Sequence, residues 1–138
     1  MDEKLLNQNF QKASPLLPSE ADEYIQKGAI IVDIRAEYET NYRVIDCPDI
    51  IYLSYDSYKE NYYRVPKEKE IVIVDNVGLV SPEVGRFLVS QGYNKVFYIS
   101  GGIIAWDHAG LPLKKDIEYE LNGGCACQIR PKKKTTNI

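Results

Sequence analysis

The stretch DNVGLVS, residues 75–81, combines the residues with the clearest potential for chemistry in this chain. The apolar run EIVIVD, which overlaps its start, predicts a buried strand, and SPEVGRFLVSQGY predicts the helix that follows. The free amide N–H groups of a helix's first turn and the helix dipole together form an anion site. An enzyme would normally place a nucleophile on the first residue of such a loop. This chain has Asp75 there, and its carboxylate is expected to fill the anion site instead of attacking a substrate.

Thiols are the second set of candidates. Cys125 and Cys127 are separated by one alanine in NGGCACQ, and the basic stretch RPKKK follows. Basic neighbours favour the thiolate form, so the pair could handle sulfur or redox equivalents, and a disulfide across one residue would be strained and easily reduced. Two alternatives remain open. The pair could be half of a soft-metal site that another chain completes, or it could belong to an idle tail. Cys47 is expected to be a packed or idle thiol in a turn, and only secondarily a stand-in nucleophile.

Other catalytic arrangements find little support in the sequence. His108 is the only histidine, and its place near a helix end predicts a solvated cap. No nucleophile elbow accompanies it, which argues against a Ser/His/Asp triad. An aspartyl-phosphate mechanism at Asp75 would need a metal site built from further carboxylates, and Asp33 is the only obvious one. We therefore expect no metal and no cofactor.

The elements that must position these residues are strands alternating with helices. Continuous apolar runs at residues 29–34, 50–54, 70–75 and 95–99 predict strands that are covered on both faces. Helices are expected at 16–28, with Ser19 as N-cap, and at 101–110, and an irregular helix is expected at 55–65. A further helix is expected to start with Ser81 as N-cap and Pro82 at the first helical position. This order predicts an α/β fold with a central parallel sheet flanked by helices.

Length and composition favour one domain in an ordinary globular protein. The 138 residues divide into a polar lead-in at 1–13, a domain at 14–113 and a tail at 114–138 that ends basic. A net charge of −3 gives no reason to expect nucleic-acid binding. The longest apolar runs are too short to cross a membrane, and the start lacks a secretory pattern, so a cytoplasmic location is expected. Three cysteines do not form a disulfide framework.

Four local motifs, in their order and spacing, resemble the rhodanese-like (sulfurtransferase) domain over residues 14–113. They are LLPSEA, then VDIRAEYE with Asp33, Arg35 and Glu39, then GGIIAW at 101–106, and AGLP at 109–112. The resemblance implies a five-stranded parallel sheet and transfer of sulfane sulfur through a cysteine persulfide. Asp33 and Arg35 could orient a substrate, but in that family they are expected to be structural groups near the pocket, with Arg35 paired to a carboxylate such as Glu39.

The loop departs from the family pattern at the residue that matters most. The resemblance implies a Cys-x-x-Gly-x-x-Ser loop, commonly with arginine before the serine. Here Gly78 and Ser81 are in place, but Asp75 replaces the cysteine and Val80 the arginine. A carboxylate cannot accept sulfur, and its charge repels thiosulfate. Phosphatases that resemble the family need the same missing cysteine. The loop is therefore expected to be catalytically silent, with Asp75 either an anion mimic that fixes the loop for a partner or a plain helix cap.

The resulting prediction is a binding or regulatory module, or a sulfur relay through tail thiols. The alternative is a working sulfurtransferase that uses Cys125 or Cys127. The expected partner is a protein or a sulfur donor or acceptor that the sequence does not identify. The candidate binding residues are Asp75, Asn76, Val77, Gly78, Leu79, Val80 and Ser81, together with Asp33 and Arg35.

Overall fold

A five-stranded parallel sheet forms the centre of the protein. The computed structural model describes residues 12–36, 40 and 43–115. Every pairing within the sheet is parallel, and the order across it is β1-β6-β5-β2-β4. The strands are β1 Ser14–Leu16, β2 Ile30–Asp33, β4 Ile50–Tyr52, β5 Ile71–Val74 and β6 Val96–Ile99.

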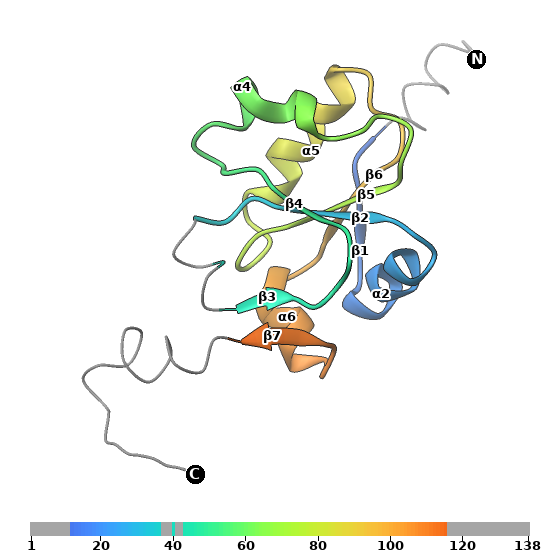
Figure 1. Ribbon diagram of the computed structural model, residues 1–138, viewed down its shortest axis with the longest axis vertical. Helices are drawn as coiled ribbons and strands as arrows, with labels where there is room; N and C mark the ends of the chain where they lie inside the picture. Colours follow the sequence, from blue (N-terminus) through green and yellow to red (C-terminus); the bar gives the residue numbers. More distant parts are fainter. Residues whose placement is uncertain (1–11, 37–39, 41–42, 116–138) are drawn as a thin grey trace.

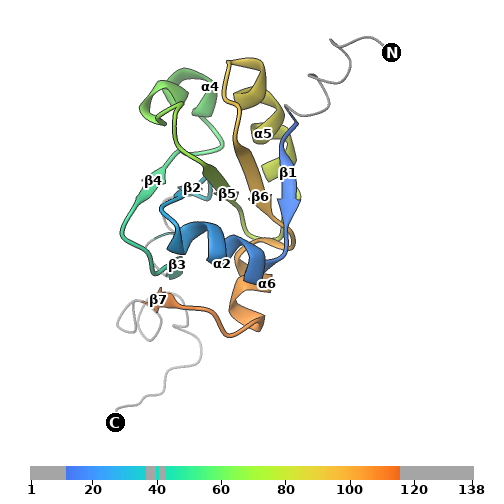
Figure 2. The ribbon, with the colours of Figure 1, turned by 90° about the vertical axis from the view of Figure 1, so that its right-hand side faces the viewer.

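Helices cover both faces of this sheet (Figure 1). On one face lie α5, Ser81–Ser90, and α4, Tyr58–Asn61, which continues into a 3-10 turn. On the other face lie α2, Pro18–Gln26, and α6, Gly102–His108, and the view turned by 90° shows α2 crossing the strands (Figure 2). The fold class expected from the alternating pattern is thus confirmed.

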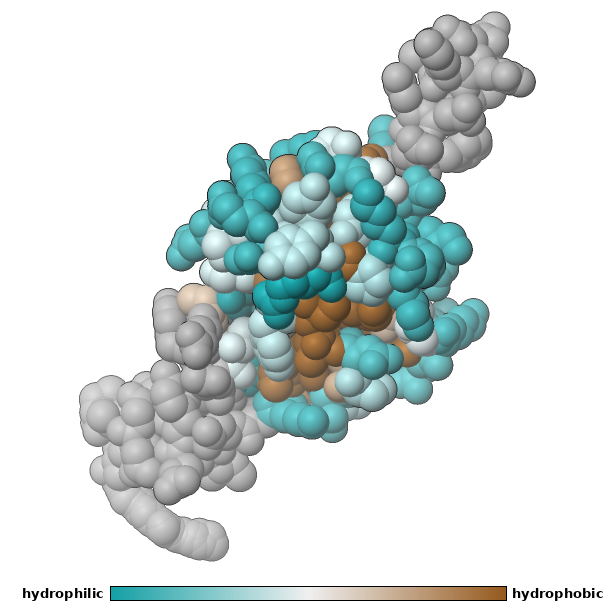
Figure 3. Space-filling view, turned by 45° about the horizontal axis from the view of Figure 1, so that its top comes forward, coloured by the Kyte–Doolittle hydropathy of each residue, from teal (hydrophilic) through white to brown (hydrophobic). Residues whose placement is uncertain are grey.

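Two apolar layers separate the helices from the sheet. Alternate residues of a strand point to opposite faces, and in β2 Val32 packs with Val84 and Leu88 of α5, while Ile31 packs with Ala21 of α2 and Trp106 of α6. This double coverage explains the continuous apolar runs in the sequence. Some apolar side chains still reach the surface, where Figure 3 shows a strip of them in the middle of one face, bordered by hydrophilic residues.

Three strands were not expected from the sequence. β1 forms one edge of the sheet, and β3, Arg43–Ile45, pairs antiparallel with β7, Leu113–Lys115. Each of the three has only three residues, too few to show a periodicity, and each depends on a partner far away in the chain. β7 begins at Leu113, the expected domain end, and runs to Lys115.

Both predicted serine caps are wrong. α2 begins at Pro18 with Leu17 as N-cap, and the Glu20 carboxylate accepts the Leu17 amide at 2.8 Å, so Ser19 lies inside the helix. α5 begins at Ser81, which makes Val80 the N-cap and places Pro82 at the second helical position. In both cases a carboxylate from another position, rather than the serine hydroxyl, satisfies amides at the helix start.

None of the helices in the described part of the chain combines the length and apolar character needed to span a membrane. Glu39, Cys125 and Cys127 lie outside the described residues, as do most of the lead-in and the tail beyond Lys115.

Candidate functional site

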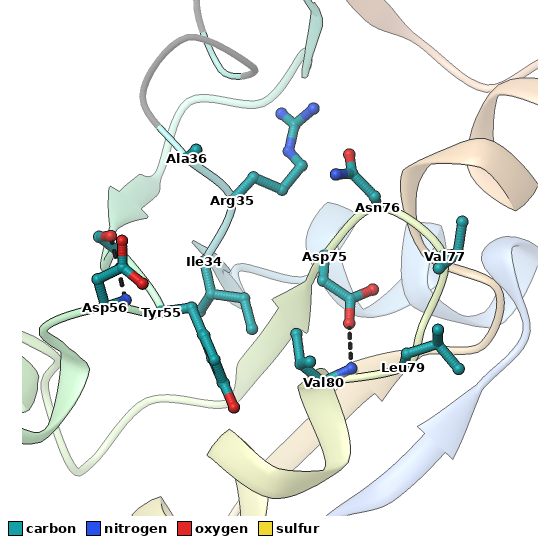
Figure 4. A pocket seen from close by; sticks show the side chains of 11 residues that line it. Ile34, Arg35, Ala36, Tyr55, Asp56, Asp75, Asn76, Val77, Leu79 and Val80 are labelled. Atoms are coloured by element: carbon teal, nitrogen blue, oxygen red, sulfur yellow. Dashed lines mark hydrogen bonds between the residues drawn. The ribbon is translucent and has the colours of Figure 1, made fainter.

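A pocket of about 340 Å³ lies where β2, β4 and β5 end. Carboxyl ends of parallel strands are where ligand sites form in open α/β sheets. Three connections supply the lining, which is shown in Figure 4. The lining residues are Ile34, Arg35 and Ala36 after β2, Ser54, Tyr55 and Asp56 after β4, and Asp75, Asn76, Val77, Leu79 and Val80 after β5.

The Asp75 carboxylate occupies the amide cradle of its own loop. One oxygen accepts the Gly78 amide, and the other accepts the amides of Val80 and Ser81, both at 2.8 Å. Asp75 is only 4% exposed, and Figure 4 shows its carboxylate turned toward the start of α5. Because the amides and the helix dipole are already satisfied by this carboxylate, the anion site of the loop is filled from within.

Ser81 is buried and contributes its backbone amide rather than its hydroxyl. Its Oγ has no hydrogen-bond partner among the described residues, and the side chain does not line the pocket. A serine hydroxyl in this position is neither a cap nor a nucleophile facing the pocket.

The loop backbone is held from the other side by α6. The carbonyl oxygens of Asp75 and Asn76 accept the amides of Ile103, at 2.9 Å, and Ile104, at 3.2 Å. Gly102 makes this contact possible, because a Cβ there would lie 2.5 Å from the Asn76 carbonyl group, and its φ of +66° suits glycine. The Gly-Gly turn expected from the sequence therefore positions the loop as well as the last helix.

Arg35 is paired inside the protein. Its Nε and Nη2 donate to the two carboxylate oxygens of Asp33 at 3.0 and 2.7 Å, and both side chains are almost fully buried. Nη2 also donates to the Arg43 carbonyl at 2.5 Å. Among the described residues its carboxylate partner is Asp33, and Glu39, the partner expected from the sequence, lies outside the described residues. In Figure 4 the guanidinium extends away from the Asp75 carboxylate.

The wall opposite the loop was missed by sequence reasoning. Tyr55 and Asp56 lie across the pocket from Val77 and Leu79 (Figure 4). The Tyr55 hydroxyl donates to Glu83 of α5 at 2.9 Å, and this bond to a carboxylate raises the pKa of Tyr55. A usable signal was present, since YDSY directly follows a buried parallel strand and so had to lie at the same sheet edge as the loop.

The tip of the loop is apolar and faces solvent. Leu79 is 81% exposed and Val77 is 49% exposed. Neither side chain belongs to the two hydrophobic clusters of the described residues, whereas Val80 packs against one of them. An apolar loop tip beside a pocket is typical of a contact surface.

The remaining candidates lie away from the pocket. Cys47 is half-buried, packs against the core and has its pKa raised chiefly by burial, which fits a packed thiol. His108 is the exposed last residue of α6. Within the described ranges, no group of three His, Cys, Asp or Glu side chains could hold a metal ion. The described residues of the pocket lining include two hydroxyls, from Ser54 and Tyr55, but no thiol.

Sequence comparison finds relatives that match most of the chain. Residues 17–109 match the family described as the rhodanese-like domain. A thiosulfate sulfurtransferase GlpE of Haemophilus influenzae (strain PittEE) is 33% identical over 98 residues, covering 71% of this chain and 91% of that protein. A sulfurtransferase of Allochromatium vinosum is 34% identical over 87 residues, covering 63% of this chain and 79% of that protein.

Solved structures show the same fold. A rhodanese-related protein from Thermoplasma volcanium superimposes with a TM-score of 0.66 at 21% identity, covering 75% of this chain and 99% of that one. A polysulfide-sulfur transferase from Wolinella succinogenes, described as a homodimer, gives a TM-score of 0.64 at 19% identity, covering 82% and 87%. At these identities the likeness concerns the fold alone.

Proposed function

Because the chain belongs to the rhodanese-like domain family, we propose that it is a member whose 75–81 loop does not transfer sulfur and serves a binding or regulatory role. Sulfur handling, where it occurs, takes place on the tail thiols Cys125 and Cys127. The protein works in the cytoplasm, where thiols stay reduced.

The observation that carries the proposal is the three-amide contact of the Asp75 carboxylate. Persulfide chemistry on this loop requires a sulfur atom that is held by the same amides and is open to a donor. The Asp75 carboxylate accepts the amides of Gly78, Val80 and Ser81, so these amides are not available to a bound sulfur atom. It cannot form an S–S bond, and its charge repels thiosulfate and other anionic donors.

The charges around the loop also differ from those of an anion-binding site. Arg35, the one cation among the described lining residues, is neutralised by Asp33, while Asp56 lines the pocket and Glu83 lies behind Tyr55. A cationic or neutral partner suits this site better than a sulfur oxyanion. The exposed Val77 and Leu79 side chains offer such a partner an apolar contact.

The tail thiols supply a nucleophile that the loop lacks. A thiolate of Cys125 or Cys127 attacks the sulfane sulfur of a polysulfide, and the shortened polysulfide leaves with the electron pair of the broken S–S bond. This exchange needs no external oxidant. The basic residues after Cys127 favour the thiolate and attract the anionic donor.

The experiment measures cyanide-labile sulfur after incubation with thiosulfate or polysulfide. Wild type and Asp75→Ala should take up equal amounts, and the double variant Cys125→Ser with Cys127→Ser should lose most of the uptake. Asp75→Cys should gain sulfur that does not depend on the tail, because it restores a thiol to the cradle.

Two results would overturn parts of the proposal. A large loss of uptake in Asp75→Ala would show that the loop takes part in transfer. Full uptake in the variant without tail thiols would remove the relay, and Cys47→Ser would then identify Cys47 as the acceptor or exclude it.

A further inference from the structure

We propose that the basic segment of the tail, residues 129–134, docks in the pocket beside Asp75 in the same chain. The inference rests on the proposed function in one respect, because docking would hold Cys125 and Cys127 at the silent loop. The position of Lys115, the charge of the pocket and the length of the tail all support it.

The described chain ends in a strand pair that contacts the arginine of the pocket lining. Lys115, the last described residue, is the register partner of Arg43 in the β3–β7 pair. The Arg43 carbonyl accepts a hydrogen bond from Arg35, and Arg35 lines the pocket. The described chain therefore ends in the strand pair that Arg35 connects to the pocket lining.

The charges of pocket and tail are complementary. A second hollow shares Tyr55 and Asp56 with the pocket and adds Glu60 and Glu83. Together the two linings hold four carboxylates and two cations, namely Asp56, Glu60, Asp75, Glu83, Arg35 and Lys59. Arg35 is already paired with Asp33. In the described part of the chain, no lysine or arginine forms an ion pair with Asp56, Glu60 or Glu83.

The tail segment IRPKKK matches this surface in charge and in apolar character. Its four cations face a site with excess negative charge, and Ile129 and Pro131 can contact the apolar loop tip at Val77 and Leu79. Burying part of Leu79, which is 81% exposed, adds an apolar contribution to the electrostatic one.

The tail is long enough to reach the pocket. Thirteen residues lie between Lys115 and Ile129, and a random-coil linker of that length spans roughly 20 Å on average. A tether of this length gives an effective concentration in the millimolar range, so a contact that would be weak between separate molecules suffices.

The test uses the full chain with a nitroxide on a single tail thiol. Cys47→Ser and Cys125→Ser leave Cys127 for labelling, and amide signals are compared between the paramagnetic and reduced forms. At low salt the signals of Tyr55 and Leu79 should lose most of their intensity, while Lys27 on the opposite face should keep it. High salt should restore the signals, because screening shortens the range of the attraction.

Charge reversal provides the matched control. Lys132→Glu, Lys133→Glu and Lys134→Glu combined should abolish the broadening. Lys67→Glu with Lys69→Glu, which alters exposed lysines just before β5 at the amino end of that strand, should leave it unchanged.

Three outcomes would overturn the docking. The first is an absence of broadening at low salt, and the second is broadening that survives charge reversal. The third is broadening found only when labelled and isotope-enriched chains are mixed, because this would assign the pocket to the tail of a second copy. None of these would affect the silent-loop proposal, which depends on sulfur uptake. Conversely, a loss of sulfur uptake in Asp75→Ala would overturn the silent loop but leave the docking measurement valid.

Discussion

Gly102 lies directly against the backbone of Asp75, so closely that a Cβ on Gly102 would lie 2.6 Å from the Asp75 carbonyl oxygen. The same carbonyl accepts the Ile103 amide. Asp75 thus contacts the starts of two helices, α6 through its backbone and α5 through its carboxylate. The loop is fixed from both sides, and a change at either contact should be felt at the pocket.

Gly102→Ala should be strongly destabilising. The new methyl group would overlap the Asn76 carbonyl, and alanine disfavours the φ of +66°. We expect a loss of at least about 2 kcal/mol in the free energy of unfolding, measured by urea denaturation. Gly110→Ala is the matched control, because its φ is +76° but nothing lies within 4 Å of its Cβ. It should cost about 1 kcal/mol. Equal losses in the two variants would argue against the close contact.

Asp75→Ala should lower stability by about 2 kcal/mol, because three amides lose their acceptor. Asp75→Asn should cost about 1 kcal/mol, since one oxygen remains while the new amide group faces an N–H donor. The exposed Asp56 provides the control, and Asp56→Asn should change stability by less than about 0.5 kcal/mol. An Asp75→Asn variant as stable as wild type would contradict the capping role.

Arg35→Met should cost about 3 kcal/mol, because it leaves the Asp33 carboxylate buried without its partner. Adding Asp33→Asn should recover part of this loss, since the uncompensated charge is then removed. Lys114→Met breaks an exposed pair with Asp46 and should cost less than about 0.5 kcal/mol. If Arg35 instead served a substrate, its loss would leave the urea midpoint nearly unchanged.

Glu83→Gln should lower the pKa of Tyr55. The bond from the Tyr55 hydroxyl to the Glu83 carboxylate favours the neutral phenol and raises its pKa, so removing the negative charge favours the phenolate. NMR titration of ring-labelled tyrosine measures this shift directly. Tyr93, whose pKa is raised chiefly by burial, is the internal control and should titrate as in wild type.

Cys47 should react slowly with iodoacetamide at neutral pH. Burial raises its pKa, so the thiolate fraction near pH 7 is smaller than for an ordinary cysteine and grows as pH increases above 9. Peptide mapping should find Cys125 and Cys127 labelled at least about tenfold faster, because basic residues follow them. Faster labelling of Cys47 would make it the candidate thiol. Labelling in urea, where all three should react alike, confirms that each thiol is free.

Much of the fold could be predicted from local pattern. The runs at 29–34 and 70–75 are continuous and apolar because both faces of β2 and β5 are covered by helices, and this is visible in sequence. β1, β3 and β7 were missed because a three-residue strand has no periodicity and is defined by its partner. The serine caps failed for a related reason, since the amides they would have served are bound by carboxylates placed by the loop and turn geometry.

The sequence by itself determined the family, the parallel α/β fold and the chemical fact that a carboxylate replaces a thiol at position 75. These depend on residue type and on order along the chain. Tertiary structure alone decided that Arg35 donates to the Arg43 carbonyl, that Tyr55 and Asp56 face the loop, and that β3 pairs with β7. These relationships join segments that the sheet brings together, and a side chain's partner across such a gap depends on strand order and register, which no local pattern encodes.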